Sequence, residues 1–282
     1  MQLTNISKEK ISLDKNRFLC KMEASITAKG VYIMKFNAGN NEKIEINMNI
    51  VISALRAIEK AVCEDVPNEL RENRLETNNR IGGLRGDWIN QNLRQFTVNA
   101  GGILHPFTRY GWRGRMIVDQ ENKISYSIVT RANLRQIPRK LRRTPHFLQT
   151  VLVKENGDLR GHYEQMALFD MSQFDQEVYE QDFDCIFYGA IDPSDGYRHC
   201  VICYEAVHDE VISTSLLLLD PNFNVVNEMD LCEYRKPDFS KLTVDDVPAD
   251  YSTTEHNEAT RNLLKLKQTL PKIKGHDQAK ES

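Results

Sequence analysis

Short apolar runs separated by turn residues dominate the middle and the second half of this 282-residue chain. Five runs of strand length occupy residues 113–119, 123–130, 185–191, 198–207 and 211–220. Apolar runs of this length, bounded by Gly, Pro, Asn or Asp, are typical of β-strands. Because most neighbouring runs are joined by turns, they predict a mainly antiparallel sheet built from residues 113–231.

The N-terminal part of the chain predicts two short strands followed by helices. Residues 31–36 and 43–47 have the composition of strands and are separated by a turn-rich segment. A helix is predicted over 48–63, where apolar residues recur at helical spacing: Val51, Leu55, Ile58 and Val62. The pair Gly82 and Gly83 precedes a second predicted helix over 84–96. We therefore expect an α+β fold in which N-terminal helices pack against the sheet.

The second half predicts further elements and a division into three regions. Residues 146–169 predict two strands joined by a turn at Asn156 and Gly157, and another strand is expected after 221–224. The expected regions form one compact unit: an N-terminal strand and helix region over 1–103, a sheet region over 104–236, and a C-terminal helix and tail over 237–282.

The overall composition is that of an ordinary globular protein. Hydrophobic residues make up 40% of the chain and charged residues 27%, which argues against a disordered or fibrous protein. No stretch approaches the roughly 18 apolar residues of a membrane span, and the first residues lack the apolar core of a secretion signal. The 6 cysteines are too scattered for a disulfide scaffold. These features predict a cytoplasmic protein with reduced cysteines and no membrane partner.

Charge is distributed very unevenly along the chain, although the formal net charge is only −3. Residues 71–143 hold 15 Lys or Arg against 5 Asp or Glu, whereas residues 155–258 hold 5 against 24. Arginine supplies forked donors to phosphate, and Trp or Tyr can stack on unpaired bases. The basic block therefore predicts contact with nucleic acid through these residues: Arg109, Trp112, Arg113, Arg115, Arg139, Arg142 and Arg143. Alternatively, the acidic half neutralises these arginines within the chain or binds a protein partner.

A metal-dependent nuclease is the second hypothesis. Carboxylates at strand ends can hold Mg²⁺ and activate water, and Asp192, Asp195 and Glu205 are the candidate ligands. Their arrangement resembles the carboxylate-bearing strands of restriction-like nucleases, but Ala206 and Val207 stand where that pattern requires a lysine. The alternative is that 192–196 simply forms a turn.

Histidines and cysteines supply two other candidate sites. His105 and His162 are candidate acid/base catalysts that could act with Arg109 or Arg115 on a phosphodiester. His199, Cys200 and Cys203 have a spacing suggestive of zinc binding. In a strand, however, residues 200 and 203 point to opposite faces, so we expect them to be buried free thiols.

Three sequence segments resemble those of a family of bacterial intracellular proteins with no established activity: GGLRGDWINQNL (82–93), RYGWRGRMI (109–117) and TPHFLQTVL (144–152). The resemblance spans about residues 80–240 and implies one unit, without implying a catalytic residue or a cofactor. Nucleic-acid binding is our first hypothesis. A nuclease of a toxin or phage-defence system and a non-enzymatic protein interaction module are the alternatives.

Overall fold

The computed structural model of the chain describes residues 24–26, 31–39, 42–73, 79–140, 142–160 and 174–236. Contacts divide the chain into two units, Met1–Arg235 and Lys236–Ser282. All the helices and strands given below belong to the first unit, and the predicted C-terminal helix lies outside the described residues. Among the helices described, none has the length and apolar character needed to cross a membrane.

A six-stranded mixed sheet forms the centre of this unit, with its strands in the order β4-β5-β6-β7-β8-β9. The strands are β4 (Ile103–Arg109), β5 (Trp112–Asp119), β6 (Ile124–Thr130), β7 (Arg198–Val207), β8 (Glu210–Leu219) and β9 (Val225–Asp230). Neighbouring strands are antiparallel except β6 and β7, which are parallel. The predicted α+β class, with a mainly antiparallel sheet, is confirmed.

The parallel pair follows from a helical crossover between β6 and β7, because parallel neighbours cannot be joined by a tight turn. The crossover contains α4 (Arg131–Gln136), α5 (Phe147–Glu155) and α6 (Gln176–Phe187). Short 3-10 turns lie at Val98–Ala100, Ile137–Arg139, Pro193–Asp195 and Cys232–Tyr234.

Two strand predictions in this crossover are wrong. Residues 147–155 form α5, which begins where the His146 ring nitrogen Nδ1 accepts the Leu148 N–H at 3.2 Å. Six consecutive residues of α5 are buried, so its sequence lacks the helical period and resembles a strand. The predicted strand over 185–191 begins as the last turn of α6, which Tyr188 ends with a left-handed φ of 49°. Most of the strand predicted to return after Asn156 and Gly157 lies in the segment 161–173, outside the described residues.

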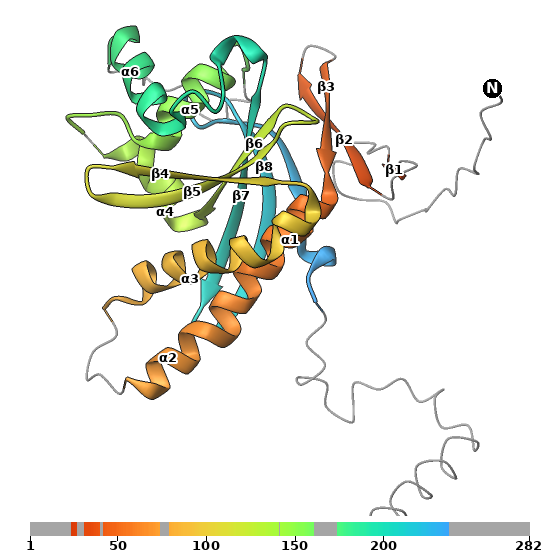
Figure 1. Cartoon of the computed structure of the whole chain (residues 1–282), viewed down its shortest axis with the longest axis vertical. Coiled ribbons are helices and arrows are strands. Elements are labelled where there is room, and N and C mark those ends of the chain that lie inside the picture. Colours follow the sequence, from red (N-terminus) through yellow and green to blue (C-terminus); the bar gives the residue numbers. More distant parts are fainter. Residues whose placement is uncertain are drawn as a thin grey trace, which may run out of the picture. The chain divides into compact units, whose positions relative to one another are not determined.

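The N-terminal elements form a small sheet and a helical pair (Figure 1). Antiparallel strands β1 (Ala24–Ile26), β2 (Tyr32–Gly39) and β3 (Glu42–Asn47) lead into α1 (Met48–Lys60). Helix α1 begins where Asn47 Oδ1 accepts the Asn49 N–H at 3.0 Å, and it continues through a π-helical turn (Ala61–Asp65) into α2 (Val66–Glu72). Helix α3 (Ile81–Phe96) packs against α1 and includes Gly82 and Gly83, which the sequence had placed before the helix.

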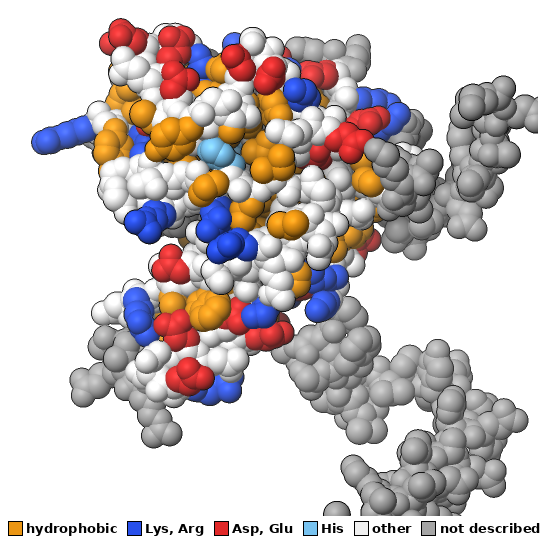
Figure 2. Space-filling view, viewed as in Figure 1, with side chains coloured by type: hydrophobic (Ala, Val, Ile, Leu, Met, Phe, Trp, Pro, Cys, Tyr) orange, Lys and Arg blue, Asp and Glu red, His pale blue; other side chains and the backbone are white. Residues whose placement is uncertain are grey.

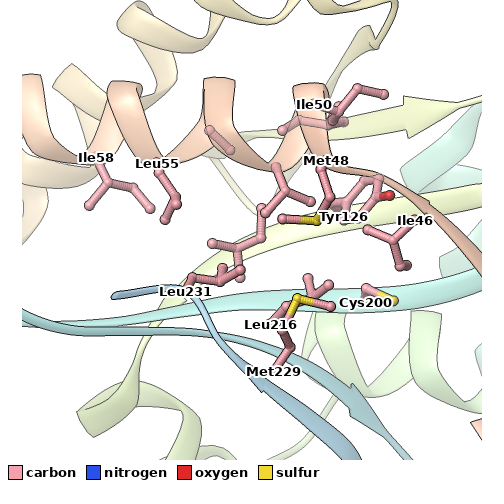
Figure 3. Close-up of a cluster of buried hydrophobic side chains, with 14 of the residues drawn as sticks. Ile46, Met48, Ile50, Leu55, Ile58, Tyr126, Cys200, Leu216, Met229 and Leu231 are labelled. Carbon is pink, nitrogen blue, oxygen red and sulfur yellow. The ribbon is translucent and has the colours of Figure 1, made fainter. Parts of the chain in front are cut away.

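The six-stranded sheet is covered on both faces, and alternate residues of its central strands belong to separate cores. Helix α1 packs on one face, where Met48, Leu55 and Ile58 lie over Cys200 and Leu216 (Figure 3). The opposite face packs against α5 and α6. Val201 and Cys203 belong to that second core, so the cysteines of β7 point to opposite faces. Both are buried free thiols, as predicted.

Strands β5 and β6 pair over only part of their length. The β4–β5 hairpin is paired from Ile103↔Val118 to Arg109↔Trp112, but β5 and β6 share only three pairs, from Ile117↔Tyr126 to Asp119↔Ile124. Strand β6 meanwhile stays paired with β7 as far as Thr130. The outer half of the hairpin therefore separates from β6, and residues 112–116 and 127–130 face each other across an opening.

Candidate nucleic-acid interface

A cleft of about 800 Å³ occupies the opening between β5 and β6. Its walls come from α3 between Gly82 and Leu93, the outer half of the β4–β5 hairpin, the end of β6, and the segment from α4 to the start of α5. Tyr204 of β7 also lines it. The volume lies within the range of about 300–1,000 Å³ that is usual for small-molecule sites.

The hairpin tip places an exposed aromatic ring at one side of the cleft. Tyr110 and Gly111 form the two-residue turn between Arg109 and Trp112, with positive φ values of 48° and 80°. This turn type favours Asn followed by Gly, and a non-glycine residue at left-handed φ costs on the order of 1 kcal/mol. The Tyr110 side chain is 76% exposed, and the Arg109 guanidinium lies 4.8 Å from the centre of its ring.

Trp112 forms the second aromatic surface at the cleft. Its ring stacks on Phe147, with centroids 5.4 Å and planes 29° apart, and meets the edge of Phe107. Gly114 makes room for this arrangement, because a Cβ there would lie 2.7 Å from Trp112 and 2.6 Å from Phe107. Trp112 is nevertheless 52% exposed, so it could still stack on a base.

Lys140 and Arg142 line the cleft together with these aromatic rings, and Arg113, Arg139 and Arg143 are sequence neighbours of residues that line it. Arg113, Arg139, Lys140, Arg142 and Arg143 are exposed, and we call this set the basic rim. Within the described part of the chain, neither the basic rim nor the half-buried Arg115 forms an ion pair. Figure 2 shows Lys and Arg side chains beside exposed hydrophobic side chains on one face of this unit.

Among the described residues, three arginines of the basic block form ion pairs with carboxylates: Arg80, Arg109 and Arg131. Arg109 donates from Nε to Asp182 Oδ1 at 2.6 Å, and Arg131 donates to Glu228 at 3.4 Å. Arg109 is therefore a structural anchor in the cleft wall, whereas no carboxylate in the described part of the chain pairs with the residues of the basic rim.

A buried polar network reaches the cleft at Ser127 and was not predicted. The Ser127 hydroxyl lies 2.9 Å from His199 Nε2, and the Ser125 hydroxyl lies 2.6 Å from Nδ1 and donates to Glu155 Oε2. Burial lowers the pKa of His199 to about 3 and raises the pKa of Glu155 to about 8. Burial thus favours the neutral form of both groups, and Asn156 holds the His199 backbone through two 2.9 Å hydrogen bonds.

A second histidine, His146, also has a lowered pKa, and its side chain lines the cleft. His146 lines the cleft, where burial and then the positive charges of Arg142 and Arg109 lower its pKa to about 3. Its Nδ1 caps α5, so the ring has a structural role.

Of the two histidines proposed as acid/base catalysts, His105 lies outside the cleft. Its Nε2 is 2.8 Å from the Ile186 carbonyl oxygen, and its ring stacks on Phe187. His162 lies outside the described residues.

The three candidate metal ligands are not brought together. Asp192 accepts the Ser194 N–H at 2.8 Å and forms a capping box with Asp195, so these two carboxylates stabilise a turn. Glu205 is exposed near the far end of β7, about 23 Å along the strand from Arg198 at the usual rise per residue. Among the described residues, no group of three or more His, Cys, Asp or Glu could hold a metal ion.

Four of the seven predicted nucleic-acid contacts line the cleft: Arg109, Trp112, Arg115 and Arg142. Arg113, Arg139 and Arg143 are exposed but do not line it. The residues predicted to contact nucleic acid did not include the glycines of α3, Tyr110, Phe147 or Lys140, although all of these line the cleft. An available signal was the occurrence of three glycines, at 82, 83 and 86, in a segment that makes no turn.

Comparison with known proteins gives a family without an activity. No curated protein and no solved structure matches the chain. One family model covers residues 43–282, and this match confirms the expected membership of a family with no established function. The chain belongs to the family of unknown function DUF5986.

Proposed function

We propose that the protein binds nucleic acid through the basic rim and the cleft beside it. The observation that carries the proposal is the set of cations in the basic rim, which make no ion pair with any described residue. Clustered cations repel one another, and a polyanion is the class of ligand that relieves this repulsion along an extended surface.

The aromatic residues favour nucleic acid over other polyanions. Trp112 and Tyr110 are exposed and line the same cleft as Lys140 and Arg142 of the basic rim. Sites for unpaired nucleic acid combine cations that follow the backbone with aromatic rings on which bases stack. Arginine predominates in the basic rim, and its planar guanidinium can hold a phosphate through two parallel hydrogen bonds.

Fluorescence anisotropy with a labelled 20-nucleotide strand of DNA or RNA tests the proposal. If five phosphates are contacted, affinity should fall about 100-fold between 50 and 200 mM salt because counterions are released on binding. The double variant Arg139→Glu/Arg143→Glu should bind at least about 20-fold more weakly at 0.1 M salt.

A matched variant distinguishes the effect of losing the basic rim from the effect of changing the net charge of the protein. Arg71→Glu/Arg94→Glu alters charge equally at exposed helical positions that do not line the cleft, and it should bind almost as well as the unaltered protein. Absence of binding at 50 mM salt, or equal losses in the two double variants, would overturn the proposal.

A further inference from the structure

We infer that the cleft between β5 and β6 accepts unpaired nucleotides, with the base on the Trp112 side and a phosphate near Arg115 and Lys140. The inference rests on the proposed function and specifies its ligand as a single strand, a strand end or a free nucleotide. A duplex would contact only the basic rim.

The size and origin of the cleft support a ligand of this kind. Its two sides are the strand segments that separate after three shared pairs, and each is held in the sheet by its other neighbour. The opening is thus built into the sheet. Its volume of about 800 Å³ suits one or two nucleotides and is too small for a duplex.

Three glycines leave part of the α3 wall of the cleft without side chains, and glycine lowers the stability of a helix. Gly82, Gly83 and Gly86 line the cleft, and a Cβ at any of them would meet nothing within 4 Å. None has a positive φ, so neither backbone conformation nor packing within the described chain requires glycine there. Gly86 costs about 1 kcal/mol relative to alanine, because it lies in the helix interior, whereas Gly82 and Gly83 lie in the first turn. A ligand that lies close against the helix backbone would explain why these positions have no side chain.

The other walls supply the chemistry of a nucleotide site. Arg115 is half-buried and lacks an ion pair within the described residues, and Lys140 and Arg142 lie at the same cleft, so a phosphate would meet three available cations. Among the lining residues, the one carboxylate belongs to Asp87, and carboxylates accept hydrogen bonds from exocyclic amines of bases. Trp112 offers the stacking surface.

The inference can be tested by replacing the glycines of α3 with larger residues, which would block the cleft without removing a side chain that could contact the ligand. Gly86→Leu would fill the cleft from α3 and strengthen the helix, because leucine is a better helix former than glycine. Gly83→Leu is an independent obstruction from a neighbouring position, and Gln91→Leu is the matched control on an exposed part of the same helix. Thermal unfolding establishes that each variant is folded.

Anisotropy should be measured with a labelled 12-nucleotide single strand and with a blunt hairpin duplex, and ATP should be used as the competing free nucleotide. We expect both glycine variants to weaken single-strand binding at least about tenfold, the equivalent of losing one stacked base, and to leave duplex binding nearly unchanged. If ATP displaces the single strand from the unaltered protein but not from Gly86→Leu, a free nucleotide is sufficient to occupy the cleft. Without competition, the ligand is a nucleotide within a strand.

Failure of the inference can be distinguished from failure of the proposed function. Single-strand binding that both folded glycine variants retain, but that Arg139→Glu/Arg143→Glu loses, would overturn the cleft inference alone. If neither the strand nor the duplex binds the unaltered protein, the proposed function fails, and the cleft inference fails with it unless ATP binds and Gly86→Leu abolishes its binding.

Discussion

Arg109 and Asp182 join the tip of the β4–β5 hairpin to α6 through a nearly buried ion pair, in which Nε donates to Oδ1 at 2.6 Å. The two side chains are only 13% and 10% exposed. Asp182 also accepts a hydrogen bond from the Thr150 hydroxyl of α5, and Arg109 donates to the Pro145 carbonyl oxygen. The part of the hairpin that leaves β6 is therefore fastened to the helical crossover instead of to the sheet.

Breaking this pair should destabilise the fold. Asp182→Asn leaves the Arg109 charge without a full partner in a poorly hydrated position, so the free energy of unfolding should fall by about 3 kcal/mol. Urea denaturation measures the loss. Glu180→Gln is the control, since Glu180 is 54% exposed and its pair with Lys154 should contribute less than about 1 kcal/mol. Equal losses in the two variants would contradict an anchoring role.

Replacing Tyr110 should separate stability from binding. Tyr110→Asn places the residue preferred at left-handed φ in the hairpin turn, so the protein should become more stable by about 1 kcal/mol. Loss of the ring should also weaken single-strand binding about tenfold. Tyr188→Asn is the matched control, because Tyr188 is 69% exposed, has a φ of 49° and ends α6 away from the cleft. A parallel loss of binding in the control would refute a specific role for Tyr110.

The buried network should make stability depend on pH with a predictable sign. Glu155 has a pKa of about 8, above its ordinary 4.5, so the folded state holds an extra proton between these values and loses stability as pH rises. His199 has a pKa of about 3, below its ordinary 6.5, so its contribution falls as pH drops below 6.5. The two effects oppose each other between pH 4.5 and 6.5, and Glu155 dominates from 6.5 to 8.

Glu155→Gln should remove the alkaline part of this dependence. Between pH 6.5 and 8 the unaltered protein should lose about 2 kcal/mol of unfolding free energy through this group, whereas the variant should lose much less. Urea denaturation at both pH values makes the comparison. If the two proteins lose stability equally, Glu155 is not the titrating group.

The cysteines of β7 should resist alkylation in the folded protein. Burial raises the pKa of Cys203 to about 11 and raises that of Cys200 further, so little thiolate is present at pH 8. Cys63, Cys185 and Cys232 are exposed and should react first with iodoacetamide. Peptide mass mapping with and without urea gives the order of reaction, and early labelling of Cys200 would contradict its placement in the core.

Local sequence patterns predicted many of the helices and strands but few of the residues that line the cleft. The helix at Met48–Lys60 and the strands at Trp112–Asp119 and Arg198–Val207 were predictable because each buries one face or a short continuous run. Helix α5 was not predictable because it is buried almost all round, which removes the helical period. The basic block with its aromatic residues was also evident from residue types alone.

Only the tertiary structure decided which of those residues share a site. Arg109 and Arg113 look alike in the sequence, yet Arg109 is paired with a carboxylate 73 residues later and Arg113 makes no ion pair within the described residues. The cleft exists because β6 stays paired with β7 while the outer half of β5 stays paired with β4 alone. That divergence depends on the pairing of β6 with β7, which are distant in the sequence. Residue order therefore determined the elements and the charge of this protein. Long-range packing decided which charges remain available and where a ligand could enter, because those depend on contacts that local patterns do not encode.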